Sequence, residues 1–366
     1  MKFSCITKNL EHSLSIVERF TGKNMTLPIL GTVLCEARDH AITISGTNLE
    51  YAIELKIPGK IIHTGKISIP AKTLLQLLQS INDEKIDIEE KQGNFIITTE
   101  TRHTRINGMR ADDFPLIPVL KKTGTVVIES IVLAHGIEKV LSSVSTSEFK
   151  PELSGVFFNV SLGTISLAST DTFRLSEKKI QIEKKQNNHI FSFILPYKVA
   201  QEVYRIYSER DEEPVHISIG DGQVVFESEG VQLVSRCIEG AFPEYSTIIP
   251  KSFDTSFFIN RNEFMSAVRS TSIFASKIQD TTLTFQKKEL HLTSQNTDIG
   301  EQTITLPISL TGKEVSVSFN YRYLLDGISV LDEEEIFIGV NQENNPALLK
   351  NKSDGSFLYV VMPIKV

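Results

Sequence analysis

Three stretches of similar sequence, ITISGTN (Ile42–Asn48), ISLASTD (Ile165–Asp171) and LHLTSQN (Leu290–Asn296), decide how this chain folds. Each begins with the alternation of apolar and polar residues typical of a half-buried strand, and each ends in residues that favour turns. The copies begin at positions 42, 165 and 290, so the sequence repeats about every 125 residues. Solenoid units are about 20–50 residues long, whereas domains contain about 50–250. The period therefore predicts three copies of one domain.

The segments that precede these stretches repeat as well. Each copy opens with a short extended run and then apolar residues close to the i, i+4, i+7 spacing of a buried helix face. These residues are Leu10, Leu14 and Val17; Leu133, Ile137, Val140 and Val144; and Phe264, Val268 and Thr271. The spacing predicts one helix near the start of each copy.

A second helix is predicted in the later half of each copy. Pro70, Pro196 and Asn320 each follow a strand-like run, and Pro and Asn suit the start of a helix. The apolar stripes that follow are Leu74, Leu77, Leu78 and Ile81; Val199, Val203 and Ile206; and Leu324, Ile328 and Leu331. An acidic cluster comes after each stripe, and we place these clusters in solvated turns. The predicted fold class is α+β, with domains at 1–120, 121–250 and 251–366.

Composition restricts the class of protein. The chain has 366 residues and is 40% hydrophobic, which is ample for packed cores. The sequence has no 18-residue apolar run and no apolar stretch at its N-terminus, so we expect neither a membrane span nor a signal peptide. Its three cysteines, Cys5, Cys35 and Cys237, are isolated from one another. Such a set favours a reducing compartment, which we take to be the cytoplasm, over disulfides or a zinc site.

The charge distribution is more informative than the total. A formal charge of −7 argues, taken alone, against binding to nucleic acid. However, cations recur on the predicted helices: Arg19, Lys23, Lys72, Lys139, Lys198, Arg205, Arg261, Arg269 and Arg322. Each of them, considered singly, is typical of a solvated helix face. Their recurrence on matching helices favours a shared role.

Motifs for catalysis are missing from the sequence. It contains no Gly-rich phosphate loop, no H-E-x-x-H, no C-x-x-C and no G-x-S-x-G. The acidic runs lack the ligand spacing and the central Gly of a calcium loop. Asp171 and Arg174 are candidates for a catalytic pair, although an ion pair or a turn-capping Asp is the simpler interpretation. The sequence therefore favours a scaffold over a catalyst, and we expect no cofactor.

A set of short segments, taken in order, resembles one family along the whole chain. They are TLPILG (26–31), GTNLE (46–50), DFP (113–115), TDTFRL (170–175), FPEY (242–245), FNY (319–321) and YVVMPIKV (359–366). Together they resemble the bacterial DNA polymerase sliding clamps, the beta subunits of the replicative polymerase. The chain is also similar to this family in its threefold repeat and its Val-Met-Pro ending.

The resemblance implies a fold and a role. In this family three α+β domains form one crescent, and two crescents join head to tail into a pseudo-sixfold ring. Helices line the hole and sheets form the outside. The ring encircles double-stranded DNA without reading its sequence, and it tethers the replicative polymerase. The other implied partners are the clamp loader, other polymerases, and mismatch repair and ligase proteins.

The resemblance also implies roles for particular residues. A docking pocket for partner peptides would contain Leu153, Thr170, Thr172, Phe173, Arg174, Leu175, Pro243, Ile248, Ile278, Asn320, Tyr323, Val360, Met362, Pro363, Ile364 and Lys365. The DNA-facing cations would be Arg19, Lys23, Lys72, Lys139, Lys150, Lys198, Arg205 and Arg269. The dimer contact would join Ile106 of one chain to Ile273 and Phe274 of the other.

This chain departs from the family pattern at the pocket. Thr172 and Phe173 stand where a Gly and then a His or Tyr are usual, and Pro363-Ile-Lys-Val366 replaces the usual ending. Two other readings remain open at this point. The first is an enzyme with its site near Asp171 and Arg174, and the second is a structural ring that holds no DNA.

Overall fold

The computed structural model describes residues 1–22, 26–38, 41–147, 149–182, 189–341 and 344–365. By their internal contacts these residues form two compact units. Unit 1 contains Met1–Ile131 and Glu209–Cys237, and unit 2 contains Val132–Ser208 and Ile238–Val366. Residues of the expected central domain, 121–250, thus contribute to both units.

Unit 1 is built on two antiparallel sheets. Its five-stranded sheet has the order β5 (Gly59–His63), β1 (Lys2–Ile6), β7 (Lys85–Lys91), β8 (Asn94–Thr98), β9 (His103–Asn107). Its eight-stranded sheet has the order β10 (Gly124–Glu129), β15 (Pro214–Gly220), β16 (Gln223–Ser228), β17 (Val231–Arg236), β4 (Tyr51–Ile57), β3 (Ala41–Thr47), β2 (Thr32–Arg38), β6 (Gly65–Pro70). The stretch ITISGTN forms β3 and the first residue after it, as the alternation predicts.

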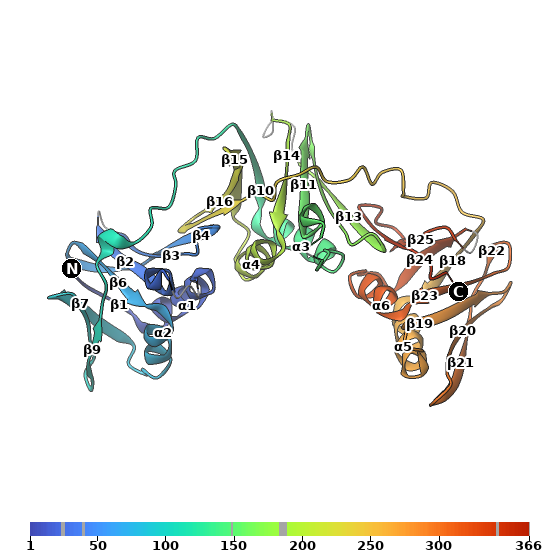
Figure 1. Cartoon of the computed structure of the whole chain (residues 1–366), viewed down its shortest axis with the longest axis horizontal. Helices are drawn as coiled ribbons and strands as arrows, with labels where there is room; N and C mark the ends of the chain where they lie inside the picture. Colours follow the sequence, from blue (N-terminus) through green and yellow to red (C-terminus); the bar gives the residue numbers. More distant parts are fainter. Residues whose placement is uncertain (23–25, 39–40, 148, 183–188, 342–343, 366) are drawn as a thin grey trace. The chain divides into compact units, whose positions relative to one another are not determined.

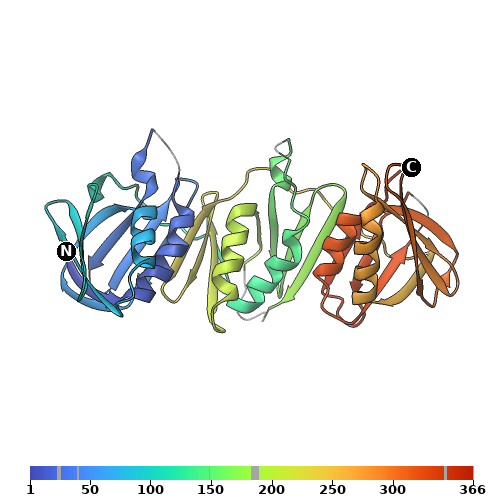
Figure 2. The same ribbon diagram turned by 90° about the horizontal axis from the view of Figure 1, so that it is seen from below.

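The helices of unit 1 bury the predicted stripes. Helix α1 (Thr7–Val17) continues into the 3-10 helix η1 (Glu18–Phe20), and Leu10, Leu14 and Val17 are fully buried. Helix α2 (Ala71–Gln79) lies beside α1, as Figures 1 and 2 show. Two further 3-10 helices are η2 (Pro28–Gly31) and η3 (Ala111–Asp113).

Unit 2 also contains two antiparallel sheets. The nine-stranded sheet has the order β14 (Phe191–Pro196), β11 (Gly155–Ser161), β12 (Thr164–Thr170), β13 (Arg174–Gln181), β26 (Phe357–Val361), β25 (Ala347–Asn351), β24 (Glu335–Val340), β18 (Thr255–Asn260), β22 (Thr311–Gly312). The four-stranded sheet has the order β21 (Gly300–Pro307), β20 (Glu289–Asn296), β19 (Asp280–Phe285), β23 (Val315–Asn320).

The unit 2 helices are α3 (Ser130–Leu141), which begins at the end of unit 1, α4 (Tyr197–Ser208), α5 (Arg261–Thr271) and α6 (Tyr321–Ser329). Two 3-10 helices, η4 (Pro151–Leu153) and η6 (Ser272–Phe274), follow α3 and α5. The side chains of Asn260 and Asn320 cap α5 and α6 by accepting hydrogen bonds from first-turn N–H groups, as predicted for Asn320. Residues of α5, α6 and both sheets share one core, in which Phe264, Phe285 and Tyr359 are fully buried.

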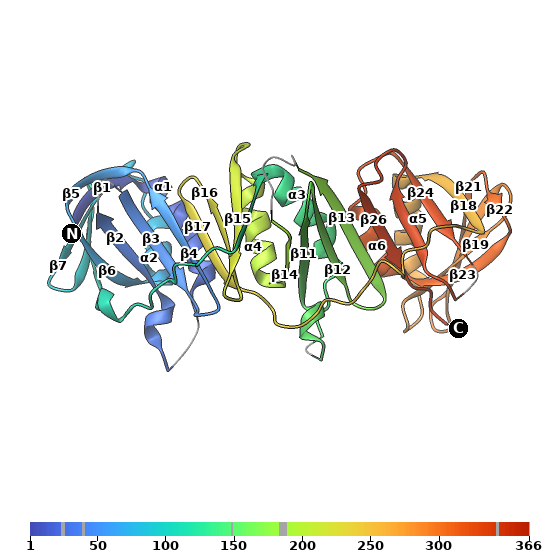
Figure 3. The same cartoon turned by 90° about the horizontal axis from the view of Figure 1, so that it is seen from above.

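Both large sheets join strands of different sequence copies. In unit 1, β4 of the first copy pairs with β17 of the second, so that Tyr51 lies opposite Ser235. In unit 2, β13 of the second copy pairs with β26 of the third, so that Arg174 lies opposite Val361. Figure 3 shows the two joins from the strand side. The whole is the predicted α+β arrangement. Within the described ranges, no helix has both the length and the apolar character needed to cross a membrane.

Candidate functional site

The predicted pocket is centred on a tight turn between β12 and β13. Thr170 Oγ1 donates to the carbonyl of Arg174 at 2.7 Å and accepts the N–H of Thr172 at 3.1 Å. Asp171 Oδ1 accepts the N–H groups of Phe173 and Arg174, each at 2.9 Å. Thr172 has φ 77°, a left-handed conformation that non-glycine residues adopt infrequently. Four hydrogen bonds to side chains therefore hold this turn in a strained shape.

A charged network fixes the Arg174 side chain beneath the turn. Its Nε donates to Asp171 Oδ2 at 3.0 Å, and its Nη1 donates to Asp326 on α6. The guanidinium carbon lies 4.4 Å from the centre of the Tyr323 ring. Burial alone would lower the pKa of Arg174, but Tyr359, Asp326 and Asp171 outweigh that effect and raise it. Asp171 and Arg174 are thus a structural ion pair.

The C-terminal tail lies against the same turn. The N–H of Met362 donates to the carbonyl of Phe173 at 2.8 Å, and the N–H of Ile364 donates to the carbonyl of Ser318 at 2.8 Å. Met362, Pro363 and Ile364 are each half-buried, whereas Lys365 is exposed. The tail therefore continues the β13–β26 pairing and leaves part of its apolar surface accessible.

An aromatic surface borders the tail. The Phe173 ring is stacked near the Tyr323 ring at a centroid distance of 6.4 Å, and 59% of Phe173 is exposed. Ile278 is 56% exposed and lies beside the start of α6, because the N–H of Tyr321 donates to Gln279 next to it. Asn320 uses its side chain to cap α6. These side chains form an apolar surface with a few polar groups.

Four predicted pocket residues have little exposed surface, and one of them is Thr170 of the turn, which is 9% exposed. Leu175 and Val360 pair across β13 and β26 and form a small cluster with Leu348, with no more than 4% of any of them exposed. Leu153 is 3% exposed at the end of η4. In this structure these side chains present little surface, and their place in the peptide pocket stays a prediction. Leu175 and Val360 lie in the paired strands β13 and β26 that carry the turn and the tail.

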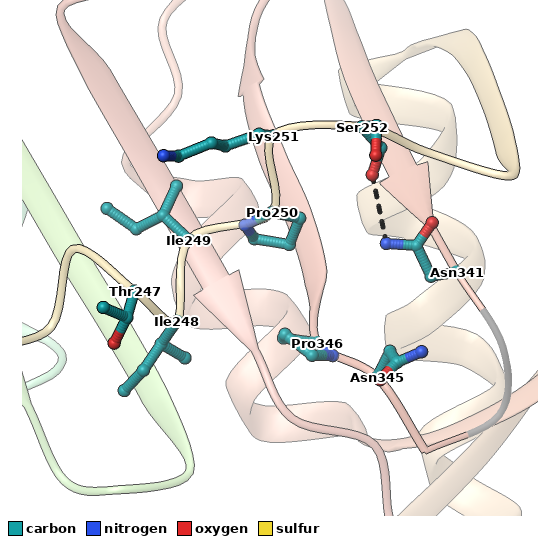
Figure 4. Close-up of a pocket in the computed structure, with 9 residues that line it drawn as sticks. All are labelled: Thr247, Ile248, Ile249, Pro250, Lys251, Ser252, Asn341, Asn345 and Pro346. Atoms are coloured by element: carbon teal, nitrogen blue, oxygen red, sulfur yellow. Dashed lines mark hydrogen bonds between the residues drawn. The ribbon is translucent and has the colours of Figure 1, made fainter.

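Two further predicted pocket residues lie on the linker before β18. Pro243 and Ile248 are both exposed on it, Ile248 by 47%. A cavity of about 540 Å³ opens between linker residues Thr247–Ser252 and the loop that carries Asn345 and Pro346. In Figure 4 the linker passes Pro346, and Asn341 donates a hydrogen bond to the carbonyl of Ser252. Ile248 thus lines this linker cavity, and its place in the docking pocket stays a prediction.

The predicted DNA-facing cations differ in their surroundings. Lys72 on α2, Lys198 on α4 and Arg269 on α5 are exposed, and so is Lys150 before η4. Arg205 is exposed but pairs with Glu202 at 2.7 Å. Arg19 is half-buried and donates to the carbonyl of Ser15. Lys23 lies outside the described residues.

Lys139 contradicts its predicted role. Its side chain is 10% exposed and contacts the Asp332 carboxylate at 2.5 Å, and it also donates to the carbonyl of Val330 after α6. The paired, enclosed ammonium group is not presented to a phosphate. Lys139 is therefore a structural residue that joins α3 to the segment after α6.

The three predicted dimer residues also differ in exposure. Ile273 is 66% exposed and Phe274 is half-buried, both on η6. Ile106 is only 8% exposed, because it lies on β9 opposite Phe95 and packs into unit 1. Its side chain therefore offers little surface, although β9 is the edge strand of its sheet.

Two residues that hold the pocket turn and the tail were not among the predicted site residues. Asp326 holds Arg174, and the Tyr359 hydroxyl donates to the carbonyl of Tyr323 at 2.8 Å. Asp326 lies three residues after Tyr323, so the helical spacing of α6 is a signal that could have placed both beside one site. Tyr359 carries no such signal, because its partner is distant in the sequence.

Comparisons with known proteins agree with this geometry. Three sequence models for the DNA polymerase III beta subunit match the chain in order. The N-terminal domain matches residues 1–118, the central domain residues 127–244 and the C-terminal domain residues 246–365. The chain belongs to the DNA polymerase III beta subunit family. The three sequence copies are thus the three clamp domains of that family.

Relatives of known name and structure share the full length. The beta sliding clamp of Synechocystis sp. is 28% identical over 389 residues, with 100% of both chains covered. That of Staphylococcus aureus (strain Mu50) is 26% identical over 353 residues and 93% of each chain. A sliding clamp structure from Bartonella birtlesii, bound to griselimycin, has a TM-score of 0.94 at 25% identity over 100% of both chains. The Thermotoga maritima beta subunit has a TM-score of 0.93 at 24% identity, covering 100% of this chain and 99% of that one.

Proposed function

We propose that this chain is the processivity factor of a replicative DNA polymerase, a non-catalytic sliding clamp of the cytoplasm. The observation that carries the proposal is the match of three successive domain models of one family to almost the entire chain. The domains that we propose are 1–120, 121–250 and 251–366.

The proposed assembly is a head-to-tail dimer that closes into a ring. Strand β9 of unit 1 and strand β21 of unit 2 each lie at the edge of a sheet. Exposed edges invite pairing with other chains, and a closed ring removes both of them. Ile273 and Phe274 on η6 lie at the end of unit 2 that carries β21, since Gly300 at the start of β21 is near the Phe274 ring. We propose that these residues meet the β9 edge, with Ile106, of the second chain.

The proposed DNA contacts are made by side chains of the helices. Lys72, Lys198 and Arg269 have exposed ammonium or guanidinium groups for which the described residues supply no ion-pair partner. Arg19, Lys23, Lys150 and Arg205 complete the proposed set, and Lys139 is removed from it. Such cations bind phosphates without reading bases, as sliding requires. The partner is double-stranded DNA of any sequence.

The proposed docking pocket receives short peptides of the polymerase catalytic subunit. The same site would serve the clamp loader, other polymerases, and mismatch repair and ligase proteins. Phe173, Tyr323, Ile278, Ile248 and Met362 provide an apolar surface for a Gln-plus-hydrophobic segment. A few buried anchors usually supply most of the affinity at such a site. Griselimycin, which is bound to the Bartonella birtlesii relative, is a compound to test for competition with such a peptide.

The enzyme alternative receives no support from the site. The Asp171 carboxylate accepts two backbone N–H groups and pairs with Arg174, so its oxygens are engaged in holding the turn. Turnover abolished by D171A, with the fold intact, would restore that alternative.

Retention on circular DNA tests the clamp proposal. The protein would be loaded onto a nicked circle by a bacterial clamp loader, and the circle then linearised by a single cut. We expect the protein to remain on the circle and to leave the linear DNA, because the tether is topological. Equal retention on both forms, or failure to associate with either, would contradict the proposal. The η6 variant I273D/F274D, which we expect to be monomeric, is the matched control and should be retained on neither form.

A further inference from the structure

Unit 1 contains a turn built like the pocket turn of unit 2. Thr47 Oγ1 donates to the carbonyl of Tyr51 at 3.0 Å and accepts the N–H of Leu49 at 3.0 Å. Asn48 Oδ1 accepts the N–H groups of Glu50 and Tyr51, each at 3.0 Å. These four bonds correspond one for one to those of the pocket turn described above. We call residues 47–51 the first turn and residues 170–174 the second turn.

The two turns share the same strained backbone. Leu49 and Thr172, the third residue of each, both have φ 77°. A leucine or a β-branched residue rarely adopts this conformation, which costs on the order of 1–3 kcal/mol. The described chain therefore maintains the same unfavourable geometry at two sites, and strain of this kind is concentrated at binding sites.

The strand that accompanies each turn is also matched. The N–H of Arg236, at the end of β17, donates to the carbonyl of Glu50 at 2.9 Å. The N–H of Met362, after β26, donates to the carbonyl of Phe173 at 2.8 Å. Arg236 thus occupies at the first turn the place that Met362 occupies at the second.

A short 3-10 helix with the same internal hydrogen bond occurs in each of the two copies. The N–H of Leu30 in η2 donates to Leu27, as that of Leu153 in η4 donates to Lys150. Leu30 and Leu153 are both buried, with 2% and 3% exposed. A Cβ placed on Gly22 would lie 3.2 Å from Leu30 and 3.4 Å from Asn48, so η2 is packed beside the first turn.

The chemistry at the first turn differs from that of the docking pocket. Leu27 and Leu49 are 44% and 49% exposed, where the second turn has Lys150 and Thr172. Arg236 and Glu50 are exposed, where the second turn has Met362 and Phe173. The described residues provide no ion-pair partner for either charge. The first turn therefore presents aliphatic side chains beside the guanidinium group of Arg236 and the carboxylate of Glu50.

We propose that the first turn, with Leu27, Leu49 and Arg236, is a second peptide-docking site on each chain. Its occupant is a linear peptide segment that carries a carboxylate next to leucine-like side chains. The carboxylate pairs with the Arg236 guanidinium in the bidentate manner that arginine favours. The leucine-like side chains cover Leu27 and Leu49. This site goes beyond the docking pocket and binds a different sequence class.

The test uses the full-length chain with methyl-labelled Leu and Met and two peptides. One is acetyl-Leu-Asp-Leu-Leu-amide, and the other is the uncharged pocket peptide acetyl-Gln-Leu-Ser-Leu-Phe-amide. We expect the acidic peptide to shift the methyl signals of Leu27 and Leu49, also when the pocket peptide is present at saturation. The pocket peptide should shift the Met362 signal.

Charge reversal makes the test specific. R236E should lower the affinity for the acidic peptide at least tenfold and leave the affinity for the pocket peptide unchanged. K60E, which reverses an exposed charge on β5, is the matched control and should change neither. Higher salt should weaken the acidic peptide. An acidic peptide that shifts only Met362, that binds R236E equally, or that fails to bind at millimolar concentration would overturn the proposal. Failure of the pocket peptide alone would instead count against the docking pocket.

Discussion

At the scale of single residues, Asp171 shows how much one side chain can organise. Its carboxylate accepts two N–H groups of its own turn and pairs with Arg174, which in turn contacts Asp326 and lies over Tyr323. Both Asp171 and Arg174 are largely enclosed, with side chains 14% and 12% exposed. The pocket turn therefore depends on a network whose loss leaves charges without partners.

Replacing Asp171 by Ala tests this network. We expect D171A to lower the free energy of unfolding by about 3 kcal/mol, because it removes one partner of an enclosed ion pair. D171N, which retains an oxygen acceptor for the two N–H groups, should lose less. Urea titration of both variants measures the difference, and equal stabilities for D171A and the parent protein would show that the network is not needed.

The cysteine thiols provide a prediction on pH. Burial, with a smaller contribution from Asp87, raises the pKa of Cys5 to about 12, and burial raises the pKa of Cys237 to about 12. The thiol of an unfolded chain has a pKa of about 8.5. The stability that the two buried thiols contribute is therefore fully present below a pH of about 8.5 and decreases as the pH rises towards 12.

We expect a chromogenic disulfide reagent at pH 8 to react slowly with the folded protein. In urea, the same reagent should react rapidly with all three thiols. The urea concentration at the midpoint of unfolding should decrease as the pH is raised from 8 to 10. Rapid reaction of Cys5 in the folded state would contradict its burial.

At the scale of elements, the C-terminal tail is attached more firmly than its position at the end of the chain suggests. Its N–H groups at Met362 and Ile364 bond to the pocket turn and to β23. It also separates binding from assembly, because η6 and β21 bear the proposed dimer contact while the tail borders Phe173. These two functions are therefore open to independent disruption.

Deleting Met362–Val366 should abolish measurable binding of a Gln-Leu-x-Leu-Phe peptide, because the deletion removes one wall of the pocket. The expected loss of affinity is at least a hundredfold. Calorimetry measures the affinity and a sizing column the assembly. R174A should reduce affinity less, since Arg174 lies beneath the pocket surface. A truncated protein that stays dimeric and binds with unchanged affinity would show that the pocket lies elsewhere.

At the scale of the whole molecule, β9 and β21 are edge strands whose outer backbone groups can pair with strands of a second chain. Ile273 is one of the most exposed aliphatic side chains of unit 2, and it lies two residues into η6 beside Phe274. Apolar exposure next to an unpaired edge is typical of an interface.

The double variant I273D and F274D should yield monomers of 41.0 kDa where the parent has about twice that mass. Two carboxylates would lose solvation in an apolar contact, which is unfavourable. Light scattering at micromolar concentration measures the mass, and circular dichroism verifies the fold. A parent protein that is strictly monomeric, or a double variant that remains dimeric, would contradict the proposed interface.

Much of this protein was determined by local sequence patterns. The three strand-and-turn stretches and the helix stripes were predicted because each depends on neighbours a few residues apart. Leu10, Leu14 and Val17 in α1, or Phe264, Val268 and Thr271 in α5, were identified from spacing alone, and all are fully buried. The pocket turn was likewise found as Thr170–Leu175.

Only the tertiary structure decided which strands join and which charges pair. The pairing of β4 with β17 and of β13 with β26 unites residues more than a hundred positions apart, and no local periodicity encodes it. For the same reason Lys139, placed among the DNA-facing cations by its helix, proved to be bound by Asp332 after α6. Leu175 and Val360, each apolar and therefore suited to either a pocket or a core, became core because their strands pair. The type of a side chain restricts its possible partners, and the tertiary fold determines which of these partners it contacts.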